Sequence, residues 1–391
     1  MAHHHPRLLW DVFCRVVDNL GDAGVCWRLA RQLAAHGHQV RLWIDDPTPL
    51  AWMALGALQG RVAGITVIPW TQPLDAALLA RLPPADVWIE AFGCEIAPEF
   101  IAAHADFTSA KNQFETPISP VWINLEYLSA ESYVERMHGL PSPVLHGPAA
   151  GRTKWFFYPG FTPRTGGLLR GRHALPETTG FDRHTWFQTH GLHWHGERAV
   201  SMFCYDPPAL AHLLTRWQLA PTLTRLLVAA GGSADAVQRA LPPTEAPAST
   251  QRQLGALTVD FLSYLPQPEF DQMMAACDLN FVRGEDSLVR ALWAGAPLVW
   301  HIYPQHDNAH HAKLQAFLDW LDAPPSLRQF HRVWNGIDRS PLPKIDLPAW
   351  RSCVLRARQR LLAQPDLCTQ LIKFVSEKRY NSRLCEPRPA S

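Results

Sequence analysis

Short apolar runs alternate with helical segments along the chain, and this alternation constrains the fold more than any other feature. In the first half, five short runs are nearly all apolar and rich in β-branched and aromatic residues, at 8–17, 39–45, 65–70, 85–93 and 121–127. Strands that are apolar on both faces are typical of a parallel sheet covered by helices. A helix over 23–36, ended by Gly37, is expected between the first two runs. The pattern predicts a doubly wound α/β unit.

A second series of the same kind follows, with runs at 199–205, 224–232, 257–264, 278–284 and 296–304. The intervening stretch, 136–198, is rich in Pro, Gly, His and Arg, and we expect long loops or a linker there. Helical patterns near 349–364 and 366–380 end the chain.

The length of 391 residues suits two or three domains. We expect two Rossmann-like doubly wound domains facing a cleft. The first covers 1–184, the second covers 196–365, and a terminal helix, about 366–391, packs back on the first.

Composition excludes several classes of function. The formal net charge of +1 gives no long-range field for nucleic acid, and the run Ala291–Gln305, which has no Asp, Glu, Lys or Arg, is too short to span a membrane. Eight scattered cysteines without a CxxC pair favour free thiols in a reducing cytoplasm. Most of the 16 tryptophans are expected to fill the core rather than stack on carbohydrate.

Two acids, Asp18 and Asp22, follow the first run, where a phosphate-binding loop would carry glycine. Gly21 and Gly24 do not have the GxGxxG spacing, so a dinucleotide site is not supported. An Asp at a helix start is often only a cap for backbone N–H groups. Two acids at the carboxyl end of a first strand are equally consistent with a ligand site, and both interpretations remain open.

The segment VRGEDSLVRALWAG, Val282–Gly295, ends a strand and opens a helix. A helix N-terminus behind Gly284 is an anion site, and Arg283 adds a charge-assisted contact to phosphate. Glu285 and Asp286 would repel a diphosphate, so they either accept hydroxyl hydrogen bonds from a sugar or cap the helix.

Other strand ends offer polar and aromatic groups. Tyr205, Tyr264 and Gln267 are suited to stacking on a base and reading its edge, although core packing also explains such aromatics. His306 and His310 have the i, i+4 spacing of metal ligands, but without a third convincing ligand a polar helix start is the preferred interpretation.

Five segments in this order closely resemble the elongation factor P arginine rhamnosyltransferases, and the resemblance extends over nearly the whole chain. They are VVDNLGDAGVCWRLARQL, INLEYLSAESYVERMHGLPSP, SMFCYD, FLSYLPQPEFDQMM and NFVRGEDSLVRALWAGAPLVWHIYPQ. The resemblance implies an inverting GT-B glycosyltransferase. It would move L-rhamnose from TDP-β-L-rhamnose to one arginine of elongation factor P, which helps ribosomes through proline runs. It implies no metal or other cofactor.

The same resemblance implies roles for individual residues. Asp22 falls on the general base, Asp18 on its essential companion and Glu285 on a further essential residue. Residues implied to contact the nucleotide sugar are Asn19, Gly21, Tyr205, Tyr264, Gln267, Arg283, Gly284, Asp286, Ser287 and Tyr303. We expect the acids to lie in the acceptor-binding domain and the phosphate-binding helix in the other. A transferase with another acceptor and a non-catalytic elongation factor P binding protein are the alternatives.

Overall fold

A computed structural model describes residues 7–17, 20–71, 74–110, 119–171, 180–243, 250–305 and 309–384, with side chains omitted at 105–110 and 382–384. The chain divides into two compact units. Unit 1 contains Met1–Leu169 and Gln364–Ser391, and unit 2 contains Arg170–Ala363. The expected boundary at 184 is therefore wrong, because residues 170–184 belong to unit 2. One cause is α6 (Arg183–Thr189), which packs on α9 (Gln267–Ala276) and whose Arg183 pairs with Asp278.

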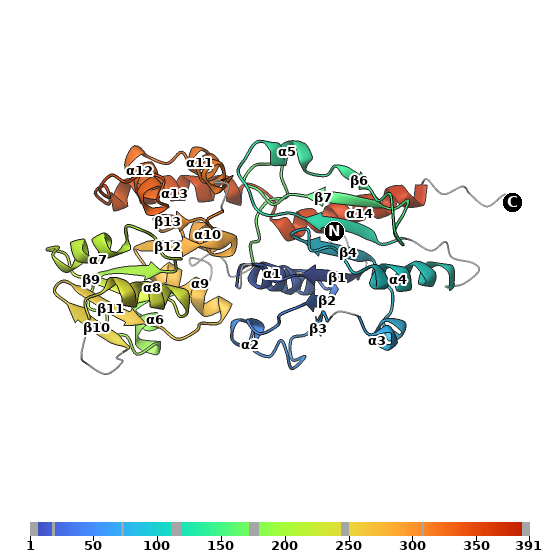
Figure 1. Cartoon of the computed structure of the whole chain (residues 1–391), viewed down its shortest axis with the longest axis horizontal. Coiled ribbons are helices and arrows are strands. Elements are labelled where there is room, and N and C mark those ends of the chain that lie inside the picture. Colours follow the sequence, from blue (N-terminus) through green and yellow to red (C-terminus); the bar gives the residue numbers. More distant parts are fainter. Residues whose placement is uncertain are drawn as a thin grey trace. The chain divides into compact units, whose positions relative to one another are not determined.

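Unit 1 is built on a seven-stranded sheet in the order β3-β2-β1-β4-β5-β7-β6, parallel except for β6 (Figure 1). Its strands are β1 (Leu9–Cys14), β2 (Gln39–Ile44), β3 (Ile65–Pro69), β4 (Val87–Ala91), β5 (Val121–Leu125), β6 (Pro141–Pro143) and β7 (Thr153–Phe157). Its helices are α1 (Gly21–Ala35), α2 (Leu50–Met53), α3 (Ala76–Arg81), α4 (Pro98–Ala110), α5 (Tyr133–Met137) and α14 (Leu367–Leu384). All five strands predicted in this half are present.

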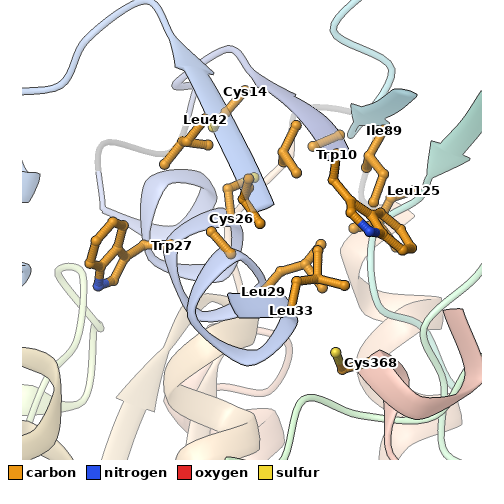
Figure 2. Packing of buried hydrophobic residues seen from close by; sticks show 14 of the residues in the cluster. Trp10, Cys14, Cys26, Trp27, Leu29, Leu33, Leu42, Ile89, Leu125 and Cys368 are labelled. Carbon is orange, nitrogen blue, oxygen red and sulfur yellow. The ribbon is translucent and has the colours of Figure 1, made fainter. Parts of the chain in front are cut away.

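The two faces of this sheet are packed by different layers. Successive side chains of a strand point to opposite faces, so Trp10 of β1 lies in one cluster and Phe13 in the other. Figure 2 shows the first cluster, in which Trp10 and Leu42 pack with residues of α1. The second contains Phe13, Trp43 and Trp88 with residues of α3 and α4. Trp10, Trp43 and Trp88 are each at most 1% exposed, which confirms their predicted place in the core.

Helix α1 follows β1 and covers the first cluster. It begins at Gly21, two residues earlier than expected, and ends before His36. Gly37 follows with φ of +89°, a conformation that favours glycine. The buried positions Cys26, Leu29, Ala30 and Leu33 repeat at helical spacing and face the sheet.

Helix α14 brings the end of the chain back to unit 1. Leu367, Cys368, Leu371 and Val375 are buried in the same cluster as Trp10, and Cys368 is visible below α1 in Figure 2. Leu367, Leu371 and Val375 are four residues apart, and Cys368 is three residues before Leu371, which places them on one side of the helix. The sheet of unit 1 is thus covered on this face by two helices far apart in the sequence.

Unit 2 repeats the architecture with a six-stranded sheet in the order β10-β11-β9-β8-β12-β13, parallel except for β10. Its strands are β8 (Arg198–Met202), β9 (Thr224–Val228), β10 (Gln251–Leu254), β11 (Leu257–Phe261), β12 (Leu279–Arg283) and β13 (Leu298–His301). Its helices, besides α6 and α9, are α7 (Leu210–Gln218), α8 (Gly232–Ala240), α10 (Gly284–Ala294), α11 (Ala309–Leu321), α12 (Pro325–Trp334) and α13 (Leu347–Leu362).

The stretch 136–198 is more structured than expected. It contains β6 and β7, which complete the sheet of unit 1, and α6 of unit 2. The strand β7 was not predicted, because the stretch is rich in proline and glycine and because Lys154 and Trp155 of β7 are only partly buried. Among the described helices, none is both long and apolar enough to cross a bilayer.

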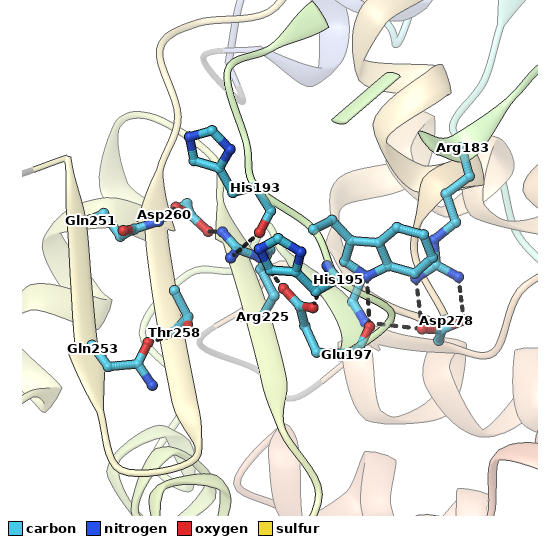
Figure 3. Close-up of polar contacts among 12 residues, drawn as sticks. Arg183, His193, His195, Glu197, Arg225, Gln251, Gln253, Thr258, Asp260 and Asp278 are labelled. Carbon is cyan, nitrogen blue, oxygen red and sulfur yellow. Dashed lines mark hydrogen bonds and ion pairs between the residues drawn. The ribbon is translucent and has the colours of Figure 1, made fainter. Parts of the chain in front are cut away.

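A buried cation joins several elements of unit 2. The Arg225 guanidinium donates to Glu197 Oε1 at 2.5 Å, to Asp260 Oδ2 at 2.8 Å and to the His193 carbonyl at 2.6 Å (Figure 3). All three charged side chains are less than 10% exposed. Arg225 and Glu197 lie near the amino ends of β9 and β8, the edge opposite to the usual ligand site. The network is therefore structural.

The open edge of β13 is capped by His331 of α12 and by Asn335, the residue that follows this helix. The Trp300 N–H donates to His331 Nε2 at 2.9 Å, and the Ile302 N–H donates to Asn335 Oδ1 at 3.0 Å. Asn335 Nδ2 donates to the Trp300 carbonyl at 2.9 Å. Since Nε2 accepts, His331 carries its proton on Nδ1 and donates it to the Leu327 carbonyl. The edge strand therefore has partners for its backbone without a further strand.

This capping predicts an acid-sensitive stability. Burial lowers the pKa of His331 to about 4, from 6.5 in an unfolded chain. The stabilisation is complete above pH 6.5 and is lost as the pH falls towards 4, because the unfolded chain then binds a proton that the fold excludes. The loss is about 3 kcal/mol at most. Denaturant unfolding between pH 7 and 4.5 should show a weaker pH dependence for His331→Gln, whose amide oxygen can accept the Trp300 N–H bond but does not titrate. An unchanged pH dependence would contradict this.

Candidate functional site

Both sheets have a topological switch point, which is where open α/β sheets bind ligands. In unit 1 it lies between β1 and β4, whose connections leave in opposite directions along the sheet. In unit 2 it lies between β8 and β12. The sequence motifs with acids and with RGEDS follow β1 and β12, so each lies at the carboxyl end of a switch-point strand.

The loop after β1 is closed by carboxylates. Asp22 Oδ2 accepts from the Val17 N–H at 2.8 Å, and Asp45 Oδ1 accepts from the Val16 N–H at 2.9 Å. Asp22 is 3% exposed and lies in the first turn of α1, where its charge complements the helix dipole. The N-cap position is instead Leu20, whose side chain makes no capping bond. Asp22 therefore links the loop to the helix and is not the N-cap residue.

Two predicted residues of this loop, Asp18 and Asn19, lie outside the described residues. Gly21 is the first residue of α1. Of the four predicted residues in this loop, the structure therefore places Gly21 and Asp22, both in the first turn of α1.

Sequence reasoning missed a second polar group at the carboxyl ends of β4 and β5. Glu90 is 1% exposed, pairs with Lys154 at 2.5 Å and accepts from Trp122 Nε1 at 3.1 Å. Asn124 lies beside Glu90 in the register and donates to Glu126 Oε1 at 2.7 Å. Burial raises the pKa of Glu126, and the nearby Glu90 adds to this effect. A charged residue inside an otherwise apolar strand was the available signal.

At the switch point of unit 2, Arg283 lies over two aromatic rings. Its guanidinium carbon is 4.4 Å from the ring centre of Phe203 and 4.9 Å from that of Tyr205. Tyr205 in turn packs edge-on against Tyr303, with centroids 5.6 Å apart. Three of the predicted residues, Tyr205, Arg283 and Tyr303, are thus brought together. They form a cationic group bordered by aromatic faces.

Helix α10 begins directly after Arg283. Gly284 has a φ of +58°, which favours glycine and turns the chain from strand to helix. The Ser287 hydroxyl donates to the Arg283 carbonyl, and Trp300 Nε1 donates to the Gly284 carbonyl at 3.1 Å. These bonds fix the turn. The first N–H groups of the eleven-residue helix have no intrahelical acceptor and are suited to an anion.

Both acids of this turn have a cationic partner. Glu285 pairs with Lys313 of α11, and Asp286 lies 3.8 Å from Arg290 Nε, one turn further along α10. No sequence motif indicates the Lys313 contact. The N-terminus of α10 is therefore less negative than its sequence suggests.

A second glycine turn borders the same region. Gly231, with φ of +81°, precedes α8, and a Cβ added there would lie 3.2 Å from the Tyr264 hydroxyl. A Cβ on Gly232 would lie 3.7 Å from Arg283 Nη1. The sequence pattern predicted these two glycines at the end of the run 224–232, without the contacts to Tyr264 and Arg283. The positive φ of Gly231 and the close Tyr264 hydroxyl favour glycine at position 231, whereas the Arg283 contact at Gly232 is at an ordinary van der Waals distance.

Gln267 is buried at the start of α9. The same helix contributes Phe270, which packs edge-on against Phe203 with centroids 5.4 Å apart. Gln267 thus belongs to the helix that borders the Phe203 side of the site.

The described residues contain no cluster of His, Cys, Asp or Glu able to hold a metal. His306 and Asp307 lie outside them. His310 is 6% exposed, and its Nδ1 accepts from the Gln305 N–H at 3.1 Å. This contact gives His310 a structural role at the end of the β13 segment.

Comparisons with known proteins agree with this geometry. The model of a family described as Elongation-Factor P (EF-P) rhamnosyltransferase EarP matches residues 10–376. A Protein-arginine rhamnosyltransferase from Pseudomonas putida is 41% identical over 389 residues, which cover 94% of this chain and 98% of that protein. One from Pseudomonas aeruginosa is 39% identical over 397 residues, with coverage of 94% and 99%.

A solved structure described as "Structural basis for EarP-mediated arginine glycosylation of translation elongation factor EF-P" is also similar. It is 28% identical, has a TM-score of 0.61, and the match covers 95% of this chain and 99% of that one. Its similarity confirms the two-domain α/β fold of the GT-B class.

Proposed function

We propose a mechanism for this chain from the premise that it belongs to the elongation factor P (EF-P) rhamnosyltransferase EarP family. It is a glycosyltransferase that transfers rhamnose to a protein arginine. The donor in this proposal is TDP-β-L-rhamnose, the acceptor is one arginine of EF-P, and the transfer inverts the anomeric centre. The modified factor then relieves ribosome stalling at proline runs.

Unit 2 binds the donor in this proposal. The observation that supports it most is the convergence of Arg283, the N-terminus of α10 and the Gly231–Gly232 turn at one switch point. Backbone N–H groups of Gly284 and Ser287 and the Arg283 guanidinium would hold the diphosphate. Other proposed donor contacts are made by Tyr205, Tyr264, Gln267, Asp286 and Tyr303.

Glu285 contacts the rhamnosyl group in this proposal. A carboxylate beside a diphosphate is unfavourable unless it has a cationic partner, and Glu285 has one in Lys313. Its oxygens are acceptors for the sugar hydroxyl groups. This role accounts for an acid in the first turn of a phosphate-binding helix.

Unit 1 binds the acceptor in this proposal, through the loop after β1. A guanidinium has a pKa above about 12 and is a poor nucleophile while it is charged. Asp18 pairs with the guanidinium and orients it, and Asp22 accepts one of its protons. The lone pair of the deprotonated guanidine nitrogen attacks C1 of rhamnose. The bond between C1 and the phosphate oxygen breaks, and TDP leaves with the electrons of that bond. Asn19 and Gly21 are proposed to contact the donor from this loop.

The rhamnosylation of EF-P tests the proposed donor and acceptor. Incubation of EF-P with this protein and TDP-β-L-rhamnose should add one deoxyhexose to a single arginine, as read by mass spectrometry of the peptides. TDP-glucose serves as the control donor. Transfer to another acceptor only would favour a different glycosyltransferase, and binding of EF-P without transfer would favour a non-catalytic binding protein.

We expect this activity to be insensitive to EDTA. Arg283 and the helix N-termini supply the positive charge that a leaving diphosphate needs. A metal would then add nothing essential. Initial rates of rhamnosylation with and without EDTA should agree. Strong inhibition would instead assign a metal to the segment that contains His306 and Asp307.

The cytoplasm is the proposed location. The seven cysteines in the described part of the chain are free and buried. Burial raises the pKa of Cys204 to about 12, so this thiol is unreactive. Free thiols are typical of a reducing compartment, which is also where a translation factor would be modified.

A further inference from the structure

The N-terminus of α10 contains two carboxylates at the place where the proposed function puts a diphosphate. Asp286 is compensated within its own helix by Arg290. Glu285 is compensated by Lys313, which lies 28 positions later in the chain, on α11. Both side chains of the second pair are about one fifth exposed, 18% for Glu285 and 22% for Lys313. The pair is therefore less screened by water than a surface ion pair.

Tertiary contacts hold Lys313 in this position. Phe317 lies one helical turn after Lys313 on α11, and its ring packs edge-on against Trp300 with centroids 5.3 Å apart. The other end of Trp300 donates through Nε1 to the Gly284 carbonyl. One tryptophan of β13 thus ties α11 to the first residue of α10. Lys313 is placed by the same packing that fixes the phosphate-binding turn.

The charges around the turn show what Lys313 contributes. Arg283, Arg290 and Lys313 carry three positive charges, against two negative charges of Glu285 and Asp286. These five side chains sum to a formal charge of +1 with Lys313 and to zero without it. The helix dipole adds to the positive side in both cases. Lys313 therefore offsets the negative charge that Glu285 brings to this helix start.

We propose that Lys313 is a positioning residue for the transfer reaction, acting through Glu285. Its ammonium group orients the Glu285 carboxylate towards the sugar and cancels the repulsion between that carboxylate and the donor diphosphate. This inference rests on the proposed function for the identity of the donor. The nucleotide alone is enough to test the charge compensation.

A mutant cycle isolates this role. The variants are Lys313→Met, Lys313→Arg, Glu285→Gln and the double variant Glu285→Gln with Lys313→Met. Asp319→Asn is the matched control, because it breaks another ion pair of α11, with Arg328 at 2.5 Å. Calorimetry measures the Kd for TDP, and the EF-P assay measures kcat and KM for TDP-rhamnose. Thermal melts verify that every variant is folded.

Lys313→Met should weaken TDP binding about fivefold and lower kcat/KM about 10- to 100-fold, the usual cost of a misplaced group. Lys313→Arg should stay within about threefold of the wild type, since it keeps the charge. In the double variant the carboxylate is gone, so TDP affinity should return to within about twofold of the wild type.

The cycle also separates the ways in which the proposal fails. If Lys313→Met weakened TDP binding by the same factor in the Glu285→Gln background as in the wild type, Lys313 would contact the phosphates directly. That result would overturn the proposal. Wild-type affinity and activity in Lys313→Met would do the same. If the variants showed the expected coupling between Lys313 and Glu285 in TDP binding, but the wild-type protein did not use TDP-rhamnose, only the proposed donor would be contradicted.

Discussion

Asp22→Asn is expected to reduce the turnover of EF-P about 10²- to 10⁴-fold, the range that a general base contributes. The amide keeps an oxygen that can accept the Val17 N–H bond, so the loop after β1 should keep its geometry. Because the proposed diphosphate-binding groups, Arg283 and the N-terminus of α10, lie in unit 2, TDP binding should be unchanged. The measurement is single-turnover rhamnosylation together with TDP calorimetry.

Asp45→Asn is the matched control for this variant. Asp45 also accepts a backbone N–H of the same loop, from Val16, but it is exposed. The Asp45→Asn variant should therefore retain most of the activity. Wild-type turnover in Asp22→Asn would show that Asp22 only links the loop to α1. Equal losses in both variants would indicate that loop geometry, and not proton transfer, limits the rate.

Arg225→Met is expected to lower the free energy of unfolding by about 3–5 kcal/mol, the usual cost of leaving buried charges without a partner. Glu197 and Asp260 would both lose their guanidinium contacts while remaining less than 10% exposed. Burial opposes ionisation of Glu197, yet the Arg225 guanidinium and backbone N–H groups hold its pKa below the usual value. Denaturant titration of wild type and variant measures the difference.

Arg239→Met provides the comparison at an exposed pair. Arg239 and Asp206 lie 2.9 Å apart, but both side chains are more than 60% exposed, so the expected loss is below about 1 kcal/mol. Adding Glu197→Gln and Asp260→Asn to Arg225→Met should restore part of the stability, because no buried charge then remains unpaired. If Arg225→Met were no more destabilising than Arg239→Met, the network would not be a major source of stability.

Much of the fold was predictable because its signals are local. The apolar runs that became β1 and β12 are buried on both faces, and strands of this kind can be recognised from their own residues. The segment around β7 was missed, since its exposed residues and flanking Pro and Gly lack that pattern. The boundary at 184 was wrong because α6 is assigned by its packing on α9 and not by its composition.

The sequence by itself determined which residue types follow the switch-point strands, with Asp22 in the segment after β1 and Arg283 at the end of β12. Only the tertiary structure decided what surrounds them. Lys313 reaches Glu285 from another helix, and Tyr264 lies against the Gly231 turn. A strand or helix start is specified by neighbours within one turn, whereas these contacts join residues that only the packing of whole elements brings together.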